Sequence, residues 1–405
     1  MKRFFVILLA LSLLLCGCSK EKTVPKVPTP LQQSHIDAIP VATADMTEDQ
    51  LRQIVLDFFR LQLTFQWTPK ESFAYAITTY KEPRSFEKNT VYAGLPYQAT
   101  SKAGNIYWAM TLYDPETGIL DNSGMDGQAF SQLLGNHCTS SPYWAWARVV
   151  NSTPQYGNVR MTKHYGFLPV GDYDYDTVMW SEEESTKNVC KEAGEQRMFE
   201  AYAQLKPADG VYLFYSLGGN SHCRMVSAYP VVVRNADGSI NGMESYILYM
   251  DQGSGLKEYV AEDGSTVQLQ GKVDEKATFA ELFSKSYITF TFWEFIGTDP
   301  VEKAQVTTNL PAEVTLQEIV GGILTSNYPM AYTHITLTDA SGKTVYDQKA
   351  HSDTINVYAL FFGKILPISE LRSLLEKGEL NLTVQVLVST GELITAYEGK
   401  IMEGQ

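Results

Sequence analysis

Cys138 has the surroundings of a nucleophilic cysteine. It lies in residues 135–140 (GNHCTS), which run into the aromatic and Ala-rich stretch 141–147. Small polar residues followed by a stretch that can be buried predict a loop that enters a helix, here over about 138–150. The N-terminus of a helix favours the thiolate, which is the reactive form of cysteine. The alternative for Cys138 is a small buried side chain without chemistry.

A thiolate nucleophile requires a base, and His222 is the candidate. It follows two glycines, Gly218 and Gly219, and begins a predicted strand over 222–234. An imidazole at the start of a strand can face a helix that packs across the sheet. We therefore expect His222 to take the proton of Cys138 and later to protonate a leaving amine.

The third group of a triad is expected at the end of a neighbouring strand. Residues 244–251 form a second predicted strand, and Asp237-Gly238 lies between the two strands as a typical hairpin turn. Antiparallel pairing brings the end of the second strand to the start of the first. Either Asp251 or Gln252 could then hold the imidazole in its useful tautomer. We expect Asp251, because a carboxylate also stabilises the imidazolium.

The helices and strands predicted around these residues indicate an α+β fold class. Thr47 and Gln50 form a capping box at the start of an amphipathic pattern that ends before Pro69. Further helices and a strand are predicted near 126–134, 193–205 and 210–217. Residues 46–299 are therefore expected to form one domain in which helices pack on an antiparallel sheet.

A separate all-β domain is predicted for residues 300–405. The composition shifts there to short alternating runs rich in Thr, Val and Leu. The predicted strands are 334–338, 343–346, 355–361 and 380–388, with one short helix at 367–376. This pattern is typical of a small β-sandwich and resembles the immunoglobulin-like modules of bacterial surface proteins.

Three separated motifs resemble those of the NlpC-type cell-wall endopeptidases, a branch of the papain-like cysteine peptidases. Residues 94–97 (GLPY) look like the family's G-x-P-Y segment. Residues 135–140 look like its D-C-S-G nucleophile motif, and residues 221–226 (SHCRMV) look like its H-V strand. The motifs occur in the family's order, and the resemblance covers about residues 90–255.

The resemblance implies both a papain-like fold and a function. The family's triad would correspond to Cys138, His222 and Asp251, and its motif tyrosine, which helps to bind substrate and the oxyanion, to Tyr97. Family members hydrolyse peptide bonds of peptidoglycan stem peptides without a metal or a cofactor. We therefore expect a cysteine peptidase that acts on stem peptides. Gln132, six residues before Cys138, has the spacing of the oxyanion glutamine of papain-like enzymes, and it equally fits a helix surface.

Two positions depart from the family pattern. His137 stands where the family has an Asp that braces the loop, and Ser140 stands where it has a Gly that leaves room at the thiol. These departures favour a non-catalytic cell-wall-binding lipoprotein that keeps the fold. An N-acetylmuramoyl-L-alanine amidase-type hydrolase is the nearest enzymatic alternative. A surface adhesion module that recognises its partner through residues 301–405 is a third hypothesis.

The start of the chain predicts export. Lys2 and Arg3 precede an apolar run over 4–15, which is too short to span a bilayer and has the length of a signal-peptide core. Residues 15–19 (LCGCS) resemble the lipobox of bacterial lipoproteins. In that family the last cysteine of the motif, here Cys18, is lipidated after the signal peptide is removed.

The lipobox divides the start of the chain into two expected segments. Residues 1–17 would be the signal peptide. Residues 18–45 carry four prolines among polar residues, which predicts an extended tether. We therefore expect an extracytoplasmic protein that is attached to the cell membrane through its N-terminal lipid.

The charge composition of the chain argues against nucleic acid as a partner. With 32 Lys and Arg against 46 Asp and Glu, the 405-residue chain has a net charge of −14, so it lacks the basic surface that nucleic-acid binding requires. No glycine-rich phosphate-binding motif is present. Beyond the lipobox the cysteines are Cys138, Cys190 and Cys223, an odd number that leaves at least one thiol free. A disulfide between Cys190 and Cys223 is a further expectation.

Overall fold

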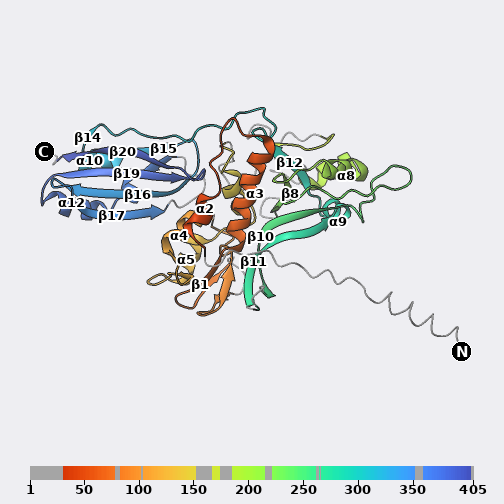
Figure 1. The fold of residues 1–405 in the computed structure, drawn as a ribbon, viewed down its shortest axis with the longest axis horizontal. Coiled ribbons are helices and arrows are strands. Elements are labelled where there is room, and N and C mark those ends of the chain that lie inside the picture. The colour runs from red at the N-terminus through yellow and green to blue at the C-terminus, as the bar shows by residue number, and fades with distance from the viewer. Residues whose placement is uncertain are drawn as a thin grey trace.

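Two hydrophobic cores organise the molecule. The computed structural model describes residues 31–77, 83–101, 104–151, 167–173, 185–214, 221–260, 264, 266–351 and 359–402 (Figure 1). The larger cluster of buried apolar side chains is drawn mostly from residues 31–301, and the second from residues 304–401. Helices and strands are mixed in the first part and strands dominate the second, so the α+β class with an all-β part is confirmed.

A ten-stranded sheet forms the framework of the first part. In spatial order its strands are β5 (Tyr113–Asp114), β6 (Ile119–Leu120), β1 (Gln66–Pro69), β4 (Val91–Ala93), β11 (Thr266–Thr278), β10 (Tyr246–Val260), β9 (Ser221–Val226), β8 (Gly210–Phe214), β12 (Ile288–Phe292) and β7 (Phe167–Leu168). The pairs β1–β6 and β4–β11 are parallel, and the central strands β11, β10, β9 and β8 are antiparallel to one another. A separate hairpin pairs β2 (Phe73–Ala76) with β3 (Pro83–Phe86).

The helices described in the first part are α2 (Gln33–Asp37), α3 (Glu48–Thr64), α4 (Ile106–Leu112), α5 (Gly127–Leu134), α6 (Ser140–Trp146), α7 (Thr186–Ala193), α8 (Glu195–Ala203) and α9 (Phe279–Ser284). Five of these eight helices, α3, α6, α7, α8 and α9, pack on strands in the central part of this sheet. The predicted capping box is present, because the Thr47 hydroxyl accepts the Gln50 N–H at 3.4 Å and the Gln50 side chain accepts the Thr47 N–H at 2.9 Å. From this cap, α3 extends as the long helix at the centre of Figure 1 and packs on α6 and β11.

The predicted hairpin is present in a modified form. Strands β9 and β10 are antiparallel neighbours, with Tyr249 opposite Val226, and Gly238 in the connection has a φ of +85°. The first strand ends at Val226 instead of continuing to residue 234. Pro230 lacks the N–H that a continued ladder would need, and only isolated bridges link the chain beyond it. The expectation that the two strands are neighbours is confirmed, and the predicted length of the first is wrong.

The tether predicted over 18–45 is wrong for its last part. Residues 31–45 belong to the folded unit, where Leu31, Ile36 and Ile39 are buried in the larger core. Leu31 is further fixed because its N–H donates to the Tyr113 hydroxyl at 3.1 Å. The four prolines of residues 18–45 are typical of an extended segment, whereas the few apolar residues there form no periodic pattern that would indicate burial. The predicted signal peptide and residues 18–30 lie outside the described residues.

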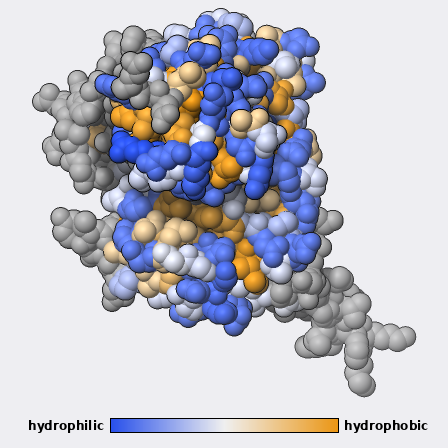
Figure 2. Space-filling view, turned by 90° about the vertical axis from the view of Figure 1, so that its left-hand side faces the viewer, coloured by the Kyte–Doolittle hydropathy of each residue, from blue (hydrophilic) through white to orange (hydrophobic). Residues whose placement is uncertain are grey.

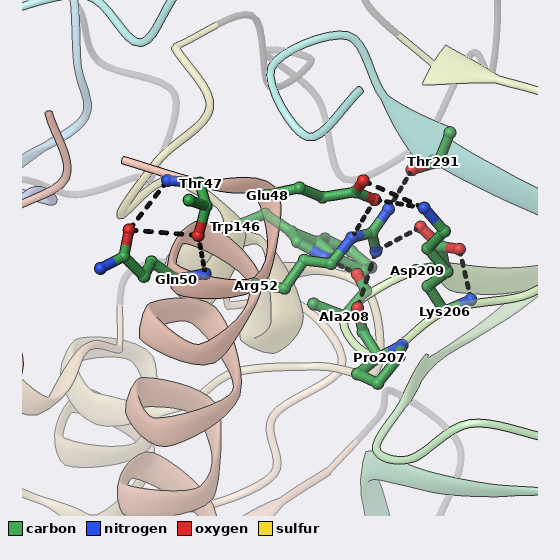
Figure 3. A network of polar contacts seen from close by, with 10 residues as sticks. All are labelled: Thr47, Glu48, Gln50, Arg52, Trp146, Lys206, Pro207, Ala208, Asp209 and Thr291. Carbon is green, nitrogen blue, oxygen red and sulfur yellow. Dashed lines mark hydrogen bonds and ion pairs between the residues drawn. The ribbon is translucent and has the colours of Figure 1, made fainter. Parts of the chain in front are cut away.

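A buried ionic network ties α3 to the edge of the sheet (Figure 3). The guanidinium of Arg52, whose side chain is 3% exposed, donates to Asp209 at 2.8 Å and to the Pro207 carbonyl at 2.7 Å. It also contacts Glu48 at 2.8 Å and Thr291 of β12 at 3.3 Å. The same figure shows the indole of Trp146, which donates to the carbonyl of Ala208, the residue before Asp209, at 2.8 Å. The network therefore fixes the carboxyl end of α6 as well as α3.

The second part is a sandwich of two sheets around its own core. The larger sheet runs β14 (Glu313–Thr315), β20 (Leu393–Met402), β19 (Leu380–Val388), β16 (Met330–Asp339) and β17 (Thr344–His351), and the smaller runs β13 (Val306–Thr308), β15 (Ile323–Ser326) and β18 (Ala359–Phe361). Its helices are α10 (Leu316–Gly321), α11 (Phe362–Ile365) and α12 (Ile368–Leu375). The strands β16, β17, β18 and β19 agree with the predicted strands and α12 with the predicted helix, although residues 355–358 lie outside the described residues. The expectation of a single helix is wrong, because α10 and α11 are also present.

The surface of this C-terminal sandwich is not uniformly polar. Seen from the left-hand side of Figure 1, the molecule is hollowed between two polar regions, and apolar side chains show in the hollow (Figure 2). Among the described residues of the sandwich, the exposed large apolar side chains are Val320, Phe361, Leu393 and Met402. Part of its apolar surface is therefore uncovered in the single chain.

The sandwich is hydrogen-bonded to the end of α6. The Ser389 hydroxyl donates to the carbonyl of Ala147 at 2.6 Å, and the Tyr328 hydroxyl, which donates to the carbonyl of Glu302 at 2.9 Å, lies 3.3 Å from the carbonyl of Val149. Both side chains are fully buried. Ala147 is the residue that follows α6, so the sandwich supplies a hydrogen-bond donor to the segment that leaves this helix.

We predict that Arg52→Ala will lower the free energy of unfolding by about 3–5 kcal/mol, because it leaves the Asp209 carboxylate buried without its cation. Urea unfolding followed by circular dichroism measures this change. The matched control is Arg60→Ala, which breaks the ion pair between Arg60 and Asp274, where both side chains are more than a third exposed. That pair should contribute no more than about 1 kcal/mol. Equal losses in the two variants would contradict the role given to the network.

Candidate active site

Cys138 lies immediately before α6, as expected. The helix is shorter than the predicted 138–150, because Cys138 and Thr139 belong to the loop that leads into it. Every residue of α6 is buried, and the aromatic side chains of Tyr143, Trp144 and Trp146 hold it in the larger core. Because α6 is held in this way, the position of Cys138, two residues before the helix, is fixed as well.

His222 and Asp251 meet across β9 and β10. The His222 Nε2 lies 2.8 Å from the Asp251 Oδ2. The observed pairing of Met225 with Met250 places Arg224 opposite Asp251 if the register continues, and His222 two positions further on the same face. The hairpin thus brings the two residues together, by a diagonal cross-strand contact.

Gln252, the alternative third residue, points elsewhere. Its side-chain amide donates to the carbonyl of Leu95 at 2.7 Å, and its carbonyl oxygen accepts from the Ser141 hydroxyl at 3.4 Å. Side chains of adjacent strand residues leave opposite faces of a sheet. Asp251 is therefore the residue that contacts the imidazole, and Gln252 joins the 94–97 segment to the start of α6.

Asp251 is surrounded by cationic groups that the sequence analysis did not identify. Its side chain is 0% exposed, and its Oδ2 lies 3.4 Å from the Arg224 Nε and 3.6 Å from the Lys272 Nζ, in addition to His222. Burial alone would raise the pKa of this carboxyl, but the hydrogen bond with His222 and the charges of His222, Lys272 and Arg224 lower it. The carboxylate is thus held ionised. The period-two alternation of β9, which puts Arg224 on the face of His222, was the signal available in the sequence.

The Cys138 thiol donates to the carbonyl of Ser221, the residue before His222, at 3.6 Å, and the thiol and the imidazole shift each other's pKa. Burial would raise the pKa of Cys138, but hydrogen bonds with His137 and His222 and the proximity of both rings lower it to about 6. Burial would lower the pKa of His222, but its hydrogen bonds with Asp251 and Cys138 raise it to about 9. Between these values the thiolate and the imidazolium coexist, which is the reactive form of a cysteine nucleophile.

Tyr97 lies near the thiol. A parallel bridge pairs Tyr97 with Asn136, so the 94–97 segment runs beside the loop that carries Cys138. The Tyr97 N–H donates to the Gln270 side chain at 2.7 Å. Burial, followed by the charge of Cys138 and a hydrogen bond with it, raises the pKa of the Tyr97 hydroxyl. The phenol therefore remains protonated and can donate.

The 94–97 segment requires glycine at its first position. Gly94 has a φ of +76°, which other residues adopt at a cost. A side chain there would also place its Cβ 2.6 Å from the carbonyl oxygen of Leu63 in α3. Close packing of this turn on α3 therefore fixes the position of Tyr97 relative to the loop that carries Cys138.

Other expected residues do not bind the thiol. The Gln132 side chain donates to the Thr100 hydroxyl at 2.7 Å, so its amide is engaged away from Cys138. Cys190 and Cys223 are free and buried, so the disulfide expected between them is wrong. The Cys190 thiol lies 3.6 Å from the carbonyl of Tyr287, where burial raises its pKa to about 12. Cys18 lies outside the described residues.

The described residues contain no group of three or more His, Cys, Asp or Glu side chains that could hold a metal ion. Within the same part of the chain, no helix is both long and apolar enough to cross a membrane. Comparison of the chain with protein-family models, with curated proteins and with solved structures found no match. The chemistry of the site therefore has to be inferred from its own geometry.

We predict that Asp251→Asn will lower the pKa of His222 by at least about one unit, because the amide removes the charge that favours the imidazolium. Titration of ¹³C-labelled histidine followed by NMR would show a midpoint near 9 in the unmodified protein. The ring signal of His334, whose Nε2 lies 2.6 Å from Asp347 in the distant β16–β17 pair, is the internal control for intact folding and should have the same chemical shift in both proteins at any one pH. An unchanged His222 midpoint would show that Asp251 does not tune the imidazole.

Proposed function

We propose that this protein is a cysteine hydrolase of the papain-like, NlpC type that cleaves peptide bonds. One observation carries the proposal: the His222 ring is bound to the buried Asp251 carboxylate at 2.8 Å, and the Cys138 thiol lies beside it, where it donates to the carbonyl of the adjacent Ser221 at 3.6 Å and has its pKa lowered by His222. The thiol, the ring and the carboxylate are each placed by a different element, namely the loop before α6, β9 and β10. Side chains so placed match the nucleophile, base and orienting group of a catalytic triad.

The proposed reaction has two halves. The Cys138 thiolate attacks the carbonyl carbon of the amide, and the charge that develops on the oxygen is stabilised by a donor such as the Tyr97 hydroxyl. The His222 imidazolium gives its proton to the departing amine, which leaves a thioester on Cys138. Water then attacks the thioester while His222 takes its proton, and the carboxylic acid product and the thiolate–imidazolium pair are released. Asp251 holds the ring so that Nδ1 serves the sulfur while Nε2 stays bound to the carboxylate.

The proposed substrate is the stem peptide of peptidoglycan. Its support is the resemblance of residues 94–97, 135–140 and 221–226 to the three NlpC motifs, together with the convergence of Tyr97, Cys138 and His222 in space. A lipid anchor at Cys18 would hold the hydrolase outside the cytoplasm, on the side of the membrane where peptidoglycan lies. Wall binding without catalysis, and amidase cleavage between sugar and peptide, are the alternatives that the experiment must separate.

We predict that the purified protein will cleave muropeptides, and that Cys138→Ala and His222→Ala will each abolish cleavage with little change in melting temperature. The double variant should lose no more activity than either single variant, because the two residues act as a unit. Cys190→Ala is the matched control, since it removes a buried thiol outside the triad. Mass spectrometry of the products identifies the broken bond.

Two results would count against this proposal. Tight binding of muropeptides without cleavage would favour the wall-binding alternative. Release of intact peptides from the glycan would favour the amidase alternative.

We also predict that Cys18→Ser will release the protein from the membrane fraction or leave an unprocessed precursor, because the lipidated thiol is lost. Fractionation and intact mass measure both outcomes. Ser in place of Cys16, which would leave with the signal peptide, is the control and should leave the protein at the membrane. Unchanged fractionation and mass in Cys18→Ser would contradict the anchor.

A further inference from the structure

The Oδ2 oxygen of Asp251 faces three cationic side chains, and it shares a short hydrogen bond with one of them. The His222 Nε2 lies 2.8 Å from this oxygen. The Arg224 Nε lies 3.4 Å from it and the Lys272 Nζ 3.6 Å, both beyond the length of about 2.7–2.9 Å that is usual for a charge-assisted hydrogen bond. Among the described residues, the other oxygen of Asp251, Oδ1, has no hydrogen-bond partner. The carboxylate is therefore bound to the imidazole and paired with the other two groups by charge.

Tyr249, two residues before Asp251 in β10, holds both of these cations beside the carboxylate. The Arg224 guanidinium lies over the Tyr249 ring, 4.1 Å from its centroid, and over the Tyr287 ring at 4.8 Å. Such contacts attract a cation to the face of an aromatic ring. The Lys272 Nζ donates to the Tyr249 hydroxyl at 3.2 Å. Both cations thus keep their places through contacts that leave the hydrogen bond of Asp251 to His222.

A β-bulge brings Lys272 to this position. Tyr249 pairs with Glu275, but Asp251, two residues later in β10, pairs with Lys272, which lies three residues earlier in β11. Regular antiparallel pairing would place Val273 opposite Asp251. The extra residue in β11 changes which side chain faces the neighbouring strand. The bulge therefore puts a cation, in place of an apolar side chain, beside the carboxylate.

The bulge is held by a contact from α3. Asp274, within the bulge, has a φ of +53°, which is uncommon for residues other than glycine. Its carboxylate accepts from both terminal nitrogens of the Arg60 guanidinium, at 2.7 and 2.9 Å. An unfavourable backbone conformation persists only where the surrounding structure imposes it. The sheet therefore maintains a strained residue that keeps Lys272 opposite Asp251.

The titratable groups around His222 and Asp251 come from several elements. The Cys138 thiol acts on the ring from the loop before α6, and the charges that act on Asp251 besides His222 are those of Lys272 and Arg224. The remaining titratable groups near Cys138 and this pair are Tyr97, His137, Tyr143, Tyr212, Cys223 and Tyr287. Burial raises the pKa of Cys223 and of the tyrosines in this set, so they stay neutral.

We propose that Arg224 and Lys272 are positioning residues that share the charge of the Asp251 carboxylate, so that the His222 imidazolium is oriented by Asp251 and still releases its proton readily. A buried carboxylate paired with the imidazolium alone would hold that proton more strongly. The two further cations weaken this attraction and repel the imidazolium directly. A general acid works best when its pKa is not far above the working pH. This inference deepens the proposed function and takes from it the role of His222 as the proton donor.

The test is the NMR titration of ¹³C-labelled His222 in full-length Arg224→Met and Lys272→Met, which each replace a cation with an unbranched apolar side chain. The midpoint is near 9 in the unmodified protein. We expect it to rise by at least about one unit in Arg224→Met and by about half a unit in Lys272→Met. The smaller effect is expected for Lys272 because its side chain is 31% exposed, against 9% for Arg224. Lys272→Met decides the question by itself if Arg224→Met does not fold.

Two further variants serve as controls. Lys276→Met removes another cation of β11, whose Nζ lies over the Tyr246 ring at 4.1 Å, and it should leave the His222 midpoint unchanged. Arg224→Lys keeps the charge and should restore most of the wild-type midpoint. If the cations serve only to hold Asp251 in place, their loss frees the carboxylate, and the midpoint falls toward the ordinary histidine value of about 6.5. An unchanged or lowered midpoint in Lys272→Met would overturn the proposal.

The same titrations in the Cys138→Ala background separate this inference from the proposed hydrolysis. No thiolate contributes there, and Lys272→Met should still raise the His222 midpoint. Muropeptide cleavage by the variants that retain Cys138 should show the alkaline limb of kcat/KM moved to higher pH in Lys272→Met, because that limb reports loss of the imidazolium proton. Raised midpoints in a protein that cleaves nothing would support this inference while the hydrolysis fails. Cleavage with unshifted midpoints would overturn this inference and leave the hydrolysis standing.

Discussion

One buried carboxylate organises the centre of this molecule. Asp251 has no solvent exposure, and its Oδ2 is approached by His222, Arg224 and Lys272 from the strands on either side of β10. A carboxylate in such a place is tolerated only while those cations stay in reach. A slip of one residue in either strand would turn the partners to the opposite face and leave the charge alone. The ionic cluster therefore specifies the register of β9, β10 and β11 as strongly as any apolar contact does.

The position of β10 also determines the position of the nucleophile loop, through the Gln252 side chain and the 94–97 segment. Gln252, the neighbour of Asp251, binds Leu95 and contacts Ser141 from the other face of the sheet. The 94–97 segment in turn pairs with Asn136, two residues before Cys138. Consecutive residues of one strand thus contact the base, through Asp251, and the segments that hold the nucleophile loop, through Gln252. The Cys138 sulfur, the His222 ring and the Tyr97 phenol lie on three different segments. Each of these segments either contacts β10 or pairs with one that does.

Local signals in the sequence were sufficient for part of this arrangement. The capping box at Thr47 and the glycine turn before β10 are read within a few residues, and the pairing of His222 with Asp251 follows from hairpin geometry. Other features depend on burial, which no short pattern contains. Arg224 and Lys272 are ordinary surface residue types until their strands are placed beside Asp251. The packing of Leu31 and Ile36 and the distance between Cys190 and Cys223 are likewise set by contacts between segments far apart in the chain.

The bonds between the sandwich and α6 bear on the order in which the protein matures. Ser389 follows Ala147 by 242 positions, so the bond between them closes one of the longest loops in the chain. Contacts of such separation form late, because the entropy of loop closure has to be overcome first. During synthesis from the N-terminus, the nucleophile, base and carboxylate have all been made before residue 389 exists. The segment that leaves the helix behind the nucleophile receives its hydrogen bond from Ser389 only when almost the whole chain is present, which links completion of this part of the core to completion of the polypeptide.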